Sequence, residues 1–155
     1  MADGMLGRLA KWLRFMGYDT AYDSHASDPE LARRCRSENR VLLTRDQELA
    51  SRRGLRSLLI HAENLQDQLR EVVVGLGRPE EPPLRRCGVC NSILQPVDRE
   101  FVRPRAPKYI VQTHREFRYC PACDRIYWPG THYQRIQEGL DALGQSLTDH
   151  TREDA

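Results

Sequence analysis

Two pairs of cysteines are the residues of this sequence best suited to binding a metal. Cys87-Gly-Val-Cys90 and Cys120-Pro-Ala-Cys123 are both CxxC motifs, and 29 residues separate them. A CxxC turn directs two thiolates toward one point, so two such turns complete a tetrahedral zinc site. Four sulfur ligands leave no open coordination position, so we expect this zinc to be structural. Simple packing of the cysteines and a redox role are the less favoured interpretations.

Three aspartates form the second group of residues whose type and position suit metal binding or catalysis. Asp46 directly follows the apolar run of residues 41–44, while Asp3 and Asp28 each precede or open a predicted helix. Ligands of open parallel sheets bind beyond the carboxyl ends of the strands, and carboxylates favour hard cations such as Mg²⁺ or Mn²⁺. Each aspartate is also a good helix N-cap. The spacing leaves both interpretations open.

The elements that would position these aspartates alternate along the first half of the chain. Apolar residues at helical spacing end at Gly17, and Asp28-Pro-Glu opens another helix. Short, wholly apolar runs between helices favour a parallel sheet covered on both faces. We therefore expect an α/β fold with three layers. Its predicted helices span 6–16, 28–39, 46–53 and 65–76, and its predicted strands span 18–22, 41–44 and 58–60.

A proline-rich segment divides the chain. Residues 77–83 hold three prolines and one glycine, which neither a helix interior nor a central strand accommodates. We expect one domain over 1–76, a linker over 77–83, a small β-rich zinc ribbon with a C-terminal helix over 84–147, and a disordered tail over 148–155. Ribbon strands are predicted at 101–103, 109–113, 116–119 and 125–128, and the helix begins at His132.

Charge is distributed unevenly. The chain of 155 residues has 24 basic and 22 acidic residues, a net charge of +2. Residues 84–135 hold ten basic residues against four acidic ones, whereas residues 1–80 are nearly neutral. The basic segment suits a polyanion. The sequence has no apolar run long enough to span a membrane and no secretory signal pattern, so we expect a cytoplasmic protein.

Several motifs in order closely resemble the Mut-7 C-terminal RNase domain family over about residues 3–140. They are the segments 3–19, 28–31, 40–46, 86–91 and 127–135. The resemblance implies a PIN-like nuclease domain fused to a zinc ribbon, with Asp3 at the end of the first strand, Asp28 opening the second helix and Asp46 after a Thr-Arg pair. It places Arg8 and Arg45 near this cluster, with Asp19 and Asp23 as secondary candidates. Of the first strand, only Met1 and Ala2 precede Asp3.

The resemblance implies a metal-dependent ribonuclease that hydrolyses RNA phosphodiester bonds. Its acids, Asp3, Asp28 and Asp46, would hold Mg²⁺ or Mn²⁺, and the ribbon would bind RNA. The alternatives are a catalytically inactive RNA-binding or ribosome-associated adaptor and a zinc-ribbon DNA-binding regulator. The sequence indicates neither an oligomeric state nor an antitoxin-like protein partner. The candidate RNA contacts are Arg86, Arg103, Arg105, Lys108, Trp128, His132 and Arg135.

Overall fold

The computed structural model describes residues 1–131, 133–134, 137–139 and 141. The chain divides into two compact units, Met1–Ile93 and Leu94–Ala155. The first unit thus includes the segment expected as a linker, 77–83, and the first CxxC motif. The site candidates His132 and Arg135 and the expected tail 148–155 lie outside the described residues, as does most of the helix expected over 132–147.

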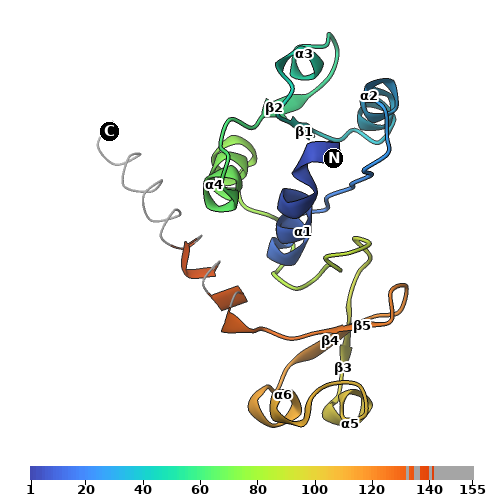
Figure 1. Ribbon diagram of the computed structural model, residues 1–155, viewed down its shortest axis with the longest axis vertical. Helices are drawn as coiled ribbons and strands as arrows, with labels where there is room; N and C mark the ends of the chain where they lie inside the picture. The colour runs from blue at the N-terminus through green and yellow to red at the C-terminus, as the bar shows by residue number, and fades with distance from the viewer. Residues whose placement is uncertain (132, 135–136, 140, 142–155) are drawn as a thin grey trace. The chain divides into compact units, whose positions relative to one another are not determined.

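The first unit alternates helices and short strands (Figure 1). Side chains at the helix starts explain several boundaries: Ser27 and Glu30 form a capping box, and Asn64 accepts a hydrogen bond from the Asp67 amide. The elements are the 3-10 helix η1 (Gly4–Leu6), the helices α1 (Gly7–Met16), α2 (Asp28–Ser37), α3 (Gln47–Ala50) and α4 (Leu65–Leu76), and the strands β1 (Leu42–Thr44) and β2 (Ser57–Leu59).

The parallel sheet is built from very short segments. Strands β1 and β2 pair in parallel, with Leu43 opposite Leu58. Ala2 forms parallel bridges to Leu43 on one side and to Tyr22 on the other. The Asp3 amide donates to the Leu43 carbonyl at 3.0 Å, and the Leu43 amide donates to the Met1 carbonyl at 2.8 Å. Residues 1–3 therefore occupy the place of the expected first strand and bring Asp3 to its carboxyl end.

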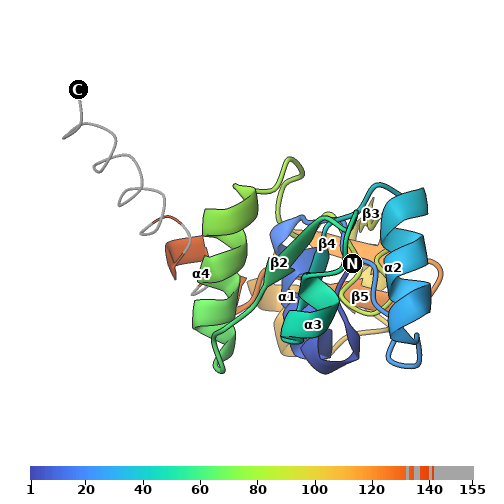
Figure 2. The same ribbon diagram turned by 90° about the horizontal axis from the view of Figure 1, so that it is seen from above.

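Helices lie on both sides of these strands. Figure 1 shows α1 and α4 on one side of β1 and β2 and α3 on the other, and Figure 2 shows α2 and α4 at opposite flanks. Leu9 and Leu13 of α1 and Val72 of α4 are buried, and Leu31, Cys35 and Leu42 pack in a second cluster. The expected mixed α/β class is confirmed. The three-layer, PIN-like arrangement remains a proposal.

The second unit contains a separate antiparallel sheet. Its strand order is β3-β4-β5, formed by β3 (Gln95–Val97), β4 (Phe117–Cys120) and β5 (Arg125–Tyr127). Between β3 and β4 the chain forms two short helices, α5 (Arg99–Val102) and α6 (Lys108–Thr113). Val102, Ile110 and Phe117 belong to a buried cluster that holds these helices to the sheet.

The helices α5 and α6 correct the strands predicted at 101–103 and 109–113. The carboxylate of Asp98 accepts a hydrogen bond from the Phe101 amide at 2.8 Å, which starts α5. Pro107 stands at the N-cap of α6, and Ile110 and Val111 both become buried. β-branched and aromatic residues suggested strands there, but packing against the core outweighs so weak a propensity. The two later strands, predicted at 116–119 and 125–128, are confirmed as β4 and β5.

Candidate functional site

Asp3 is a buried carboxylate at the carboxyl end of the sheet. Its side chain is hydrogen bonded through both oxygens, and the residue is only 5% exposed. Oδ1 accepts from the Met5 amide at 3.0 Å, which caps η1. Oδ2 accepts from the Thr44 hydroxyl and from the Arg45 amide, the latter at 3.3 Å. Among the described residues no basic side chain forms an ion pair with Asp3, so hydrogen-bond donors alone compensate its charge there.

Thr44 joins Asp3 to Asp46. Its buried hydroxyl donates to Asp3 Oδ2 and accepts from the Asp46 amide at 3.0 Å. Asp46 Oδ1 accepts from the Leu49 amide at 3.0 Å and thereby caps α3. Asp46 is exposed, and this cap uses only one of its carboxylate oxygens. The two acids are thus held at the same edge of the sheet by one side chain from the end of β1.

Asp28 is held more loosely than the other two acids. It is the first residue of α2, its side chain is 48% exposed, and its carboxylate lies 3.4 Å from the Arg52 guanidinium. The three aspartates do not form a group whose carboxylate oxygens all lie within 4.8 Å of one another. The structure therefore connects Asp3 with Asp46, and no hydrogen bond of the described residues joins Asp28 to either.

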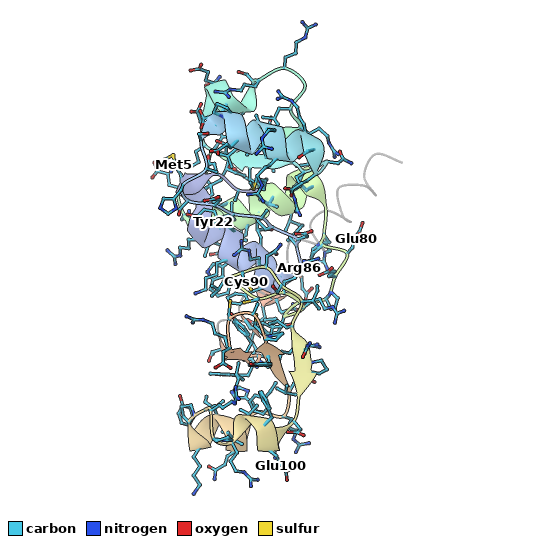
Figure 3. All side chains as sticks on the ribbon, turned by 90° about the vertical axis from the view of Figure 1, so that its right-hand side faces the viewer. Met5, Tyr22, Glu80, Arg86, Cys90 and Glu100 are labelled. Carbon is cyan, nitrogen blue, oxygen red and sulfur yellow. The ribbon has the colours of Figure 1, made fainter. Side chains whose placement is uncertain are left out.

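Two secondary candidates lie near this edge. Asp23 follows the bridge at Tyr22, and its Oδ1 accepts from the His25 amide at 3.0 Å. Arg45 contributes its backbone amide to Asp3 while the residue itself is exposed. Tyr22 and Met5, which are labelled in Figure 3, mark this edge. The Tyr22 hydroxyl donates to the Gly4 carbonyl at 3.1 Å. Arg8 is exposed in the first turn of α1.

Asp19 belongs to a different place. It precedes the bridge at Tyr22, so in a parallel arrangement it lies toward the amino end of the sheet. Arg40 donates two hydrogen bonds to its carboxylate, at 3.1 and 3.3 Å, and Asn91 donates one at 2.7 Å. Burial alone would raise the pKa of the Asp19 carboxyl, but the hydrogen bonds from Arg40 and Asn91, together with the positive charges of Arg40 and Arg86, lower that pKa below its ordinary value.

The four cysteines of the CxxC motifs converge. The sulfur atoms of Cys87, Cys90, Cys120 and Cys123 all lie within 4.8 Å of one another, and the group includes two buried residues. A tetrahedral zinc with Zn–S bonds of about 2.3 Å requires sulfur atoms roughly 3.8 Å apart, so the donor set and its spacing fit zinc. The residue after each motif, Asn91 or Asp124, has a positive φ. Asn and Asp tolerate that left-handed backbone better than most residues do.

A buried arginine fixes the backbone of the first CxxC motif. Arg14 of α1 is 5% exposed, and its guanidinium donates to the carbonyls of Gly88 at 3.1 Å, Val89 at 2.8 Å and Thr20 at 2.8 Å. The sequence pattern alone did not distinguish this arginine from the others. The available signal was its position four residues after Ala10, on the apolar side of the predicted helix. Arg86 and Cys90 of the same motif region are labelled in Figure 3.

The candidate RNA contacts differ in their surroundings. Arg103 and Lys108 are exposed. Arg105 pairs with Asp124 at 2.8 Å and lies over the Phe101 ring. The Arg86 side chain is only 15% exposed, and it pairs with Glu81 at 2.7 Å, so its guanidinium holds the segment around the first CxxC motif together. Trp128 is half-buried.

Comparisons with known proteins give one match. A family model described as Mut7-C RNAse domain matches residues 1–140, which confirms the resemblance inferred from the motifs. No curated protein and no solved structure matches the chain. Within the part of the chain that the structure describes, no helix is both long and apolar enough to cross a membrane.

Proposed function

This chain belongs to the Mut7-C RNAse domain family, and from that premise we propose that it is a metal-dependent ribonuclease that hydrolyses RNA phosphodiester bonds. The observation that best supports this proposal is the link through Thr44, which holds Asp3 and Asp46 at one edge of the sheet. A buried carboxylate beside an exposed one is a favourable starting point for binding a cation where RNA can reach it.

Asp3, Asp46 and Asp28 would hold Mg²⁺ or Mn²⁺, because carboxylate oxygens suit hard cations. Bound there, such an ion would supply a water of lowered pKa and positive charge for the scissile phosphate. Asp3 is fixed by three hydrogen bonds, and Asp46 keeps one carboxylate oxygen outside its cap. Asp28 would complete the set by leaving its contact with Arg52. Arg8 and Arg45, both exposed, are suited to contact the phosphate backbone.

The cysteine group would hold one structural zinc, since its four sulfur donors leave no position for a reacting water. The basic residues of the second unit would bind the RNA backbone, and Arg103, Arg105 and Lys108 are exposed for that role. The proposal also includes three expectations from the sequence. They are a cytoplasmic location, a PIN-like fold for the first domain, and domain limits of 1–76 and 84–147 around a linker over 77–83.

One observation favours a second candidate function. The carboxylate oxygens of Asp3, Asp28 and Asp46 do not all lie within 4.8 Å of one another, whereas a working cation site draws its ligands close together. An adaptor that binds RNA without cleaving it needs no such convergence. The adaptor would retain the basic second unit and the cysteine group, and Asp3 and Asp46 would serve only as helix caps.

Cleavage assays separate the two functions. Zinc-loaded protein is incubated with single-stranded and hairpin RNAs in Mg²⁺ or Mn²⁺, beside Asp46→Asn and the control Glu48→Gln. Asparagine is also a good N-cap, so Asp46→Asn keeps the start of α3. We expect Asp46→Asn to lower the cleavage rate at least about 100-fold, because charge stabilisation by a metal is worth several kcal/mol. Glu48→Gln, in the same short helix, is expected to stay within about twofold.

Absence of cleavage by the wild type with every RNA would favour the adaptor, and equal cleavage by Asp46→Asn would exclude this acid from the reaction. A chelator is unsuitable as the control, because it would also remove zinc from the cysteine group and unfold what the zinc stabilises.

A further inference from the structure

The second unit contains a pocket that the proposed catalytic acids do not use. Its volume is about 470 Å³, within the range of about 300–1,000 Å³ typical of small-molecule sites. It is lined by Pro107, Ile126, Tyr127 and Trp128, together with the charged residues Arg105, Asp124 and Arg125. The pocket therefore combines flat aromatic rings with positive charge at one place on β5 and the start of α6.

The aromatic wall is held in place by the core of the unit. Trp128 packs against the cluster that includes Val102 and Phe117, yet it remains half-buried rather than fully enclosed. The His114 ring lies beside it, with ring centroids 6.3 Å apart. A ring that is fixed on one side and accessible on the other can stack with a planar group without a large loss of side-chain entropy.

The two arginines that line the pocket differ in whether an acidic side chain pairs with them. Arg105 pairs with Asp124 at 2.8 Å and lies over the Phe101 and Tyr119 rings at 4.4 and 5.6 Å. Arg125, by contrast, is exposed, and among the described residues no hydrogen bond or ion pair engages its guanidinium. One positive charge is thus left at the pocket, where an anionic group would be attracted.

We propose that this pocket binds one unpaired nucleotide of RNA, with its base stacked on Trp128 and its phosphate at Arg125. The inference rests on the proposed function and specifies the substrate class as single-stranded RNA. Proteins that bind single strands combine basic grooves with aromatic stacking platforms, and every base has a face that stacks. A base inside an A-form duplex has both faces covered by its neighbours, so a duplex cannot supply the group that fits this pocket.

Fluorescence of Trp128 tests the contact directly. The chain has two tryptophans, so Trp12→Phe leaves Trp128 as the remaining one. In that background, combined with Asp46→Asn and without Mg²⁺ or Mn²⁺, an eight-nucleotide single-stranded RNA is titrated in. We expect saturable quenching of the Trp128 fluorescence by the single strand, and no saturable quenching by a blunt duplex of equal length.

Binding affinities, measured by anisotropy of a labelled RNA, locate the site. Trp128→Ala is expected to weaken binding about tenfold, and Trp128→Phe to retain most of it, since stacking contributes on the order of 1–3 kcal/mol per base. Arg125→Ala is expected to weaken binding about threefold to tenfold. It should also lower the slope of the logarithm of affinity against the logarithm of salt concentration by about one, in absolute value. Arg115 is an exposed arginine outside the pocket, so Arg115→Ala is the matched control. It should change the logarithm of the affinity by less than half as much as Arg125→Ala does.

The outcomes separate this inference from the proposed function. RNA that binds without quenching Trp128, quenching by the duplex equal to that by the single strand, or equal losses in Arg125→Ala and Arg115→Ala would each overturn the pocket as a nucleotide site. Quenching by a protein whose wild type cleaves no RNA would support the pocket while refuting the ribonuclease. Because Arg125 is exposed, its substitution keeps the test valid even if Trp128→Ala fails to fold.

Discussion

At the scale of single residues, the Thr44 hydroxyl organises the acids. It donates to Asp3 and accepts from the Asp46 amide, so the end of β1 fixes two acids that lie 43 positions apart in the chain. The sequence pointed to Asp46 because it follows an apolar run of strand length, and the family resemblance pointed to Asp3. Both acids also stand at helix starts, where an ordinary N-cap stands. The connection through Thr44 required a register between residues 1–3 and β1 that no local pattern encodes.

Asp19 offers a residue-scale test by pH. Its carboxyl pKa lies below the ordinary value of 3.8, because the hydrogen bonds from Arg40 and Asn91 and the charges of Arg40 and Arg86 together outweigh the effect of burial, which raises it. A carboxyl whose pKa is lower in the folded protein stabilises the fold above its unfolded pKa, and that stabilisation is lost as the pH falls through the folded pKa. We expect Arg40→Gln to raise the Asp19 pKa, as measured by the pH titration of its carboxyl ¹³C shift.

Arg34→Gln is the matched control for this titration. Arg34 pairs with Glu38 at 3.2 Å, and Glu38 also pairs with Arg40, so the substitution perturbs the same group of charges without removing a donor to Asp19. An Asp19 midpoint that moves equally in Arg34→Gln and Arg40→Gln would refute the assigned role of Arg40.

At the scale of elements, periodicity predicted some parts of the fold well and others badly. Helices over 6–16 and 65–76 were predicted within a residue or two, because their apolar residues recur at helical spacing. The helices α5 and α6 were predicted as strands, since four and six residues are too few to show a helical period. The Asp98 cap was the overlooked local signal.

The end of α1 gives an element-scale prediction. Gly17 terminates the helix with a φ of +106°, and a Cβ added there would lie 2.1 Å from the Glu81 carbonyl oxygen. We expect Gly17→Ala to lower the free energy of unfolding by about 3 kcal/mol or more, because both the left-handed backbone and the backbone collision oppose it. Urea unfolding of zinc-loaded protein measures this loss.

Gly54→Ala separates the two causes. Gly54 also has a positive φ, +71°, but no atom lies within 4 Å of the position its Cβ would take. Its substitution should therefore cost only the backbone term, about 1–2 kcal/mol. Equal losses in the two variants would show that the approach of Glu81 to α1 is not maintained in solution.

At the scale of the whole molecule, the cysteine group predicts one zinc per chain. The motif spacing alone indicated this group, and the convergence of its four sulfur atoms supports it. We expect Cys120→Ser to lose most of the bound zinc and to melt at a lower temperature, because binding energy of a structural zinc is folding energy. Elemental analysis and thermal unfolding followed by circular dichroism measure both effects.

Cys35→Ala is the control for zinc binding. Cys35 is buried in the cluster with Leu31 and Leu42, and burial raises the pKa of its thiol. Its removal should therefore leave one zinc per chain. Zinc content that falls as much in Cys35→Ala as in Cys120→Ser would contradict the assignment of the four ligands.

The proposed ribonuclease requires that acids at the carboxyl edge of the sheet bind a hard cation. Mn²⁺ binding to zinc-loaded protein, followed by electron paramagnetic resonance, measures this property. We expect at least one saturable Mn²⁺ site per chain that competes with Mg²⁺, is retained in Glu48→Gln and is lost or weakened at least about tenfold in Asp46→Asn. Absence of Mn²⁺ binding to the zinc-loaded wild type, or equal binding by Asp46→Asn, would contradict it.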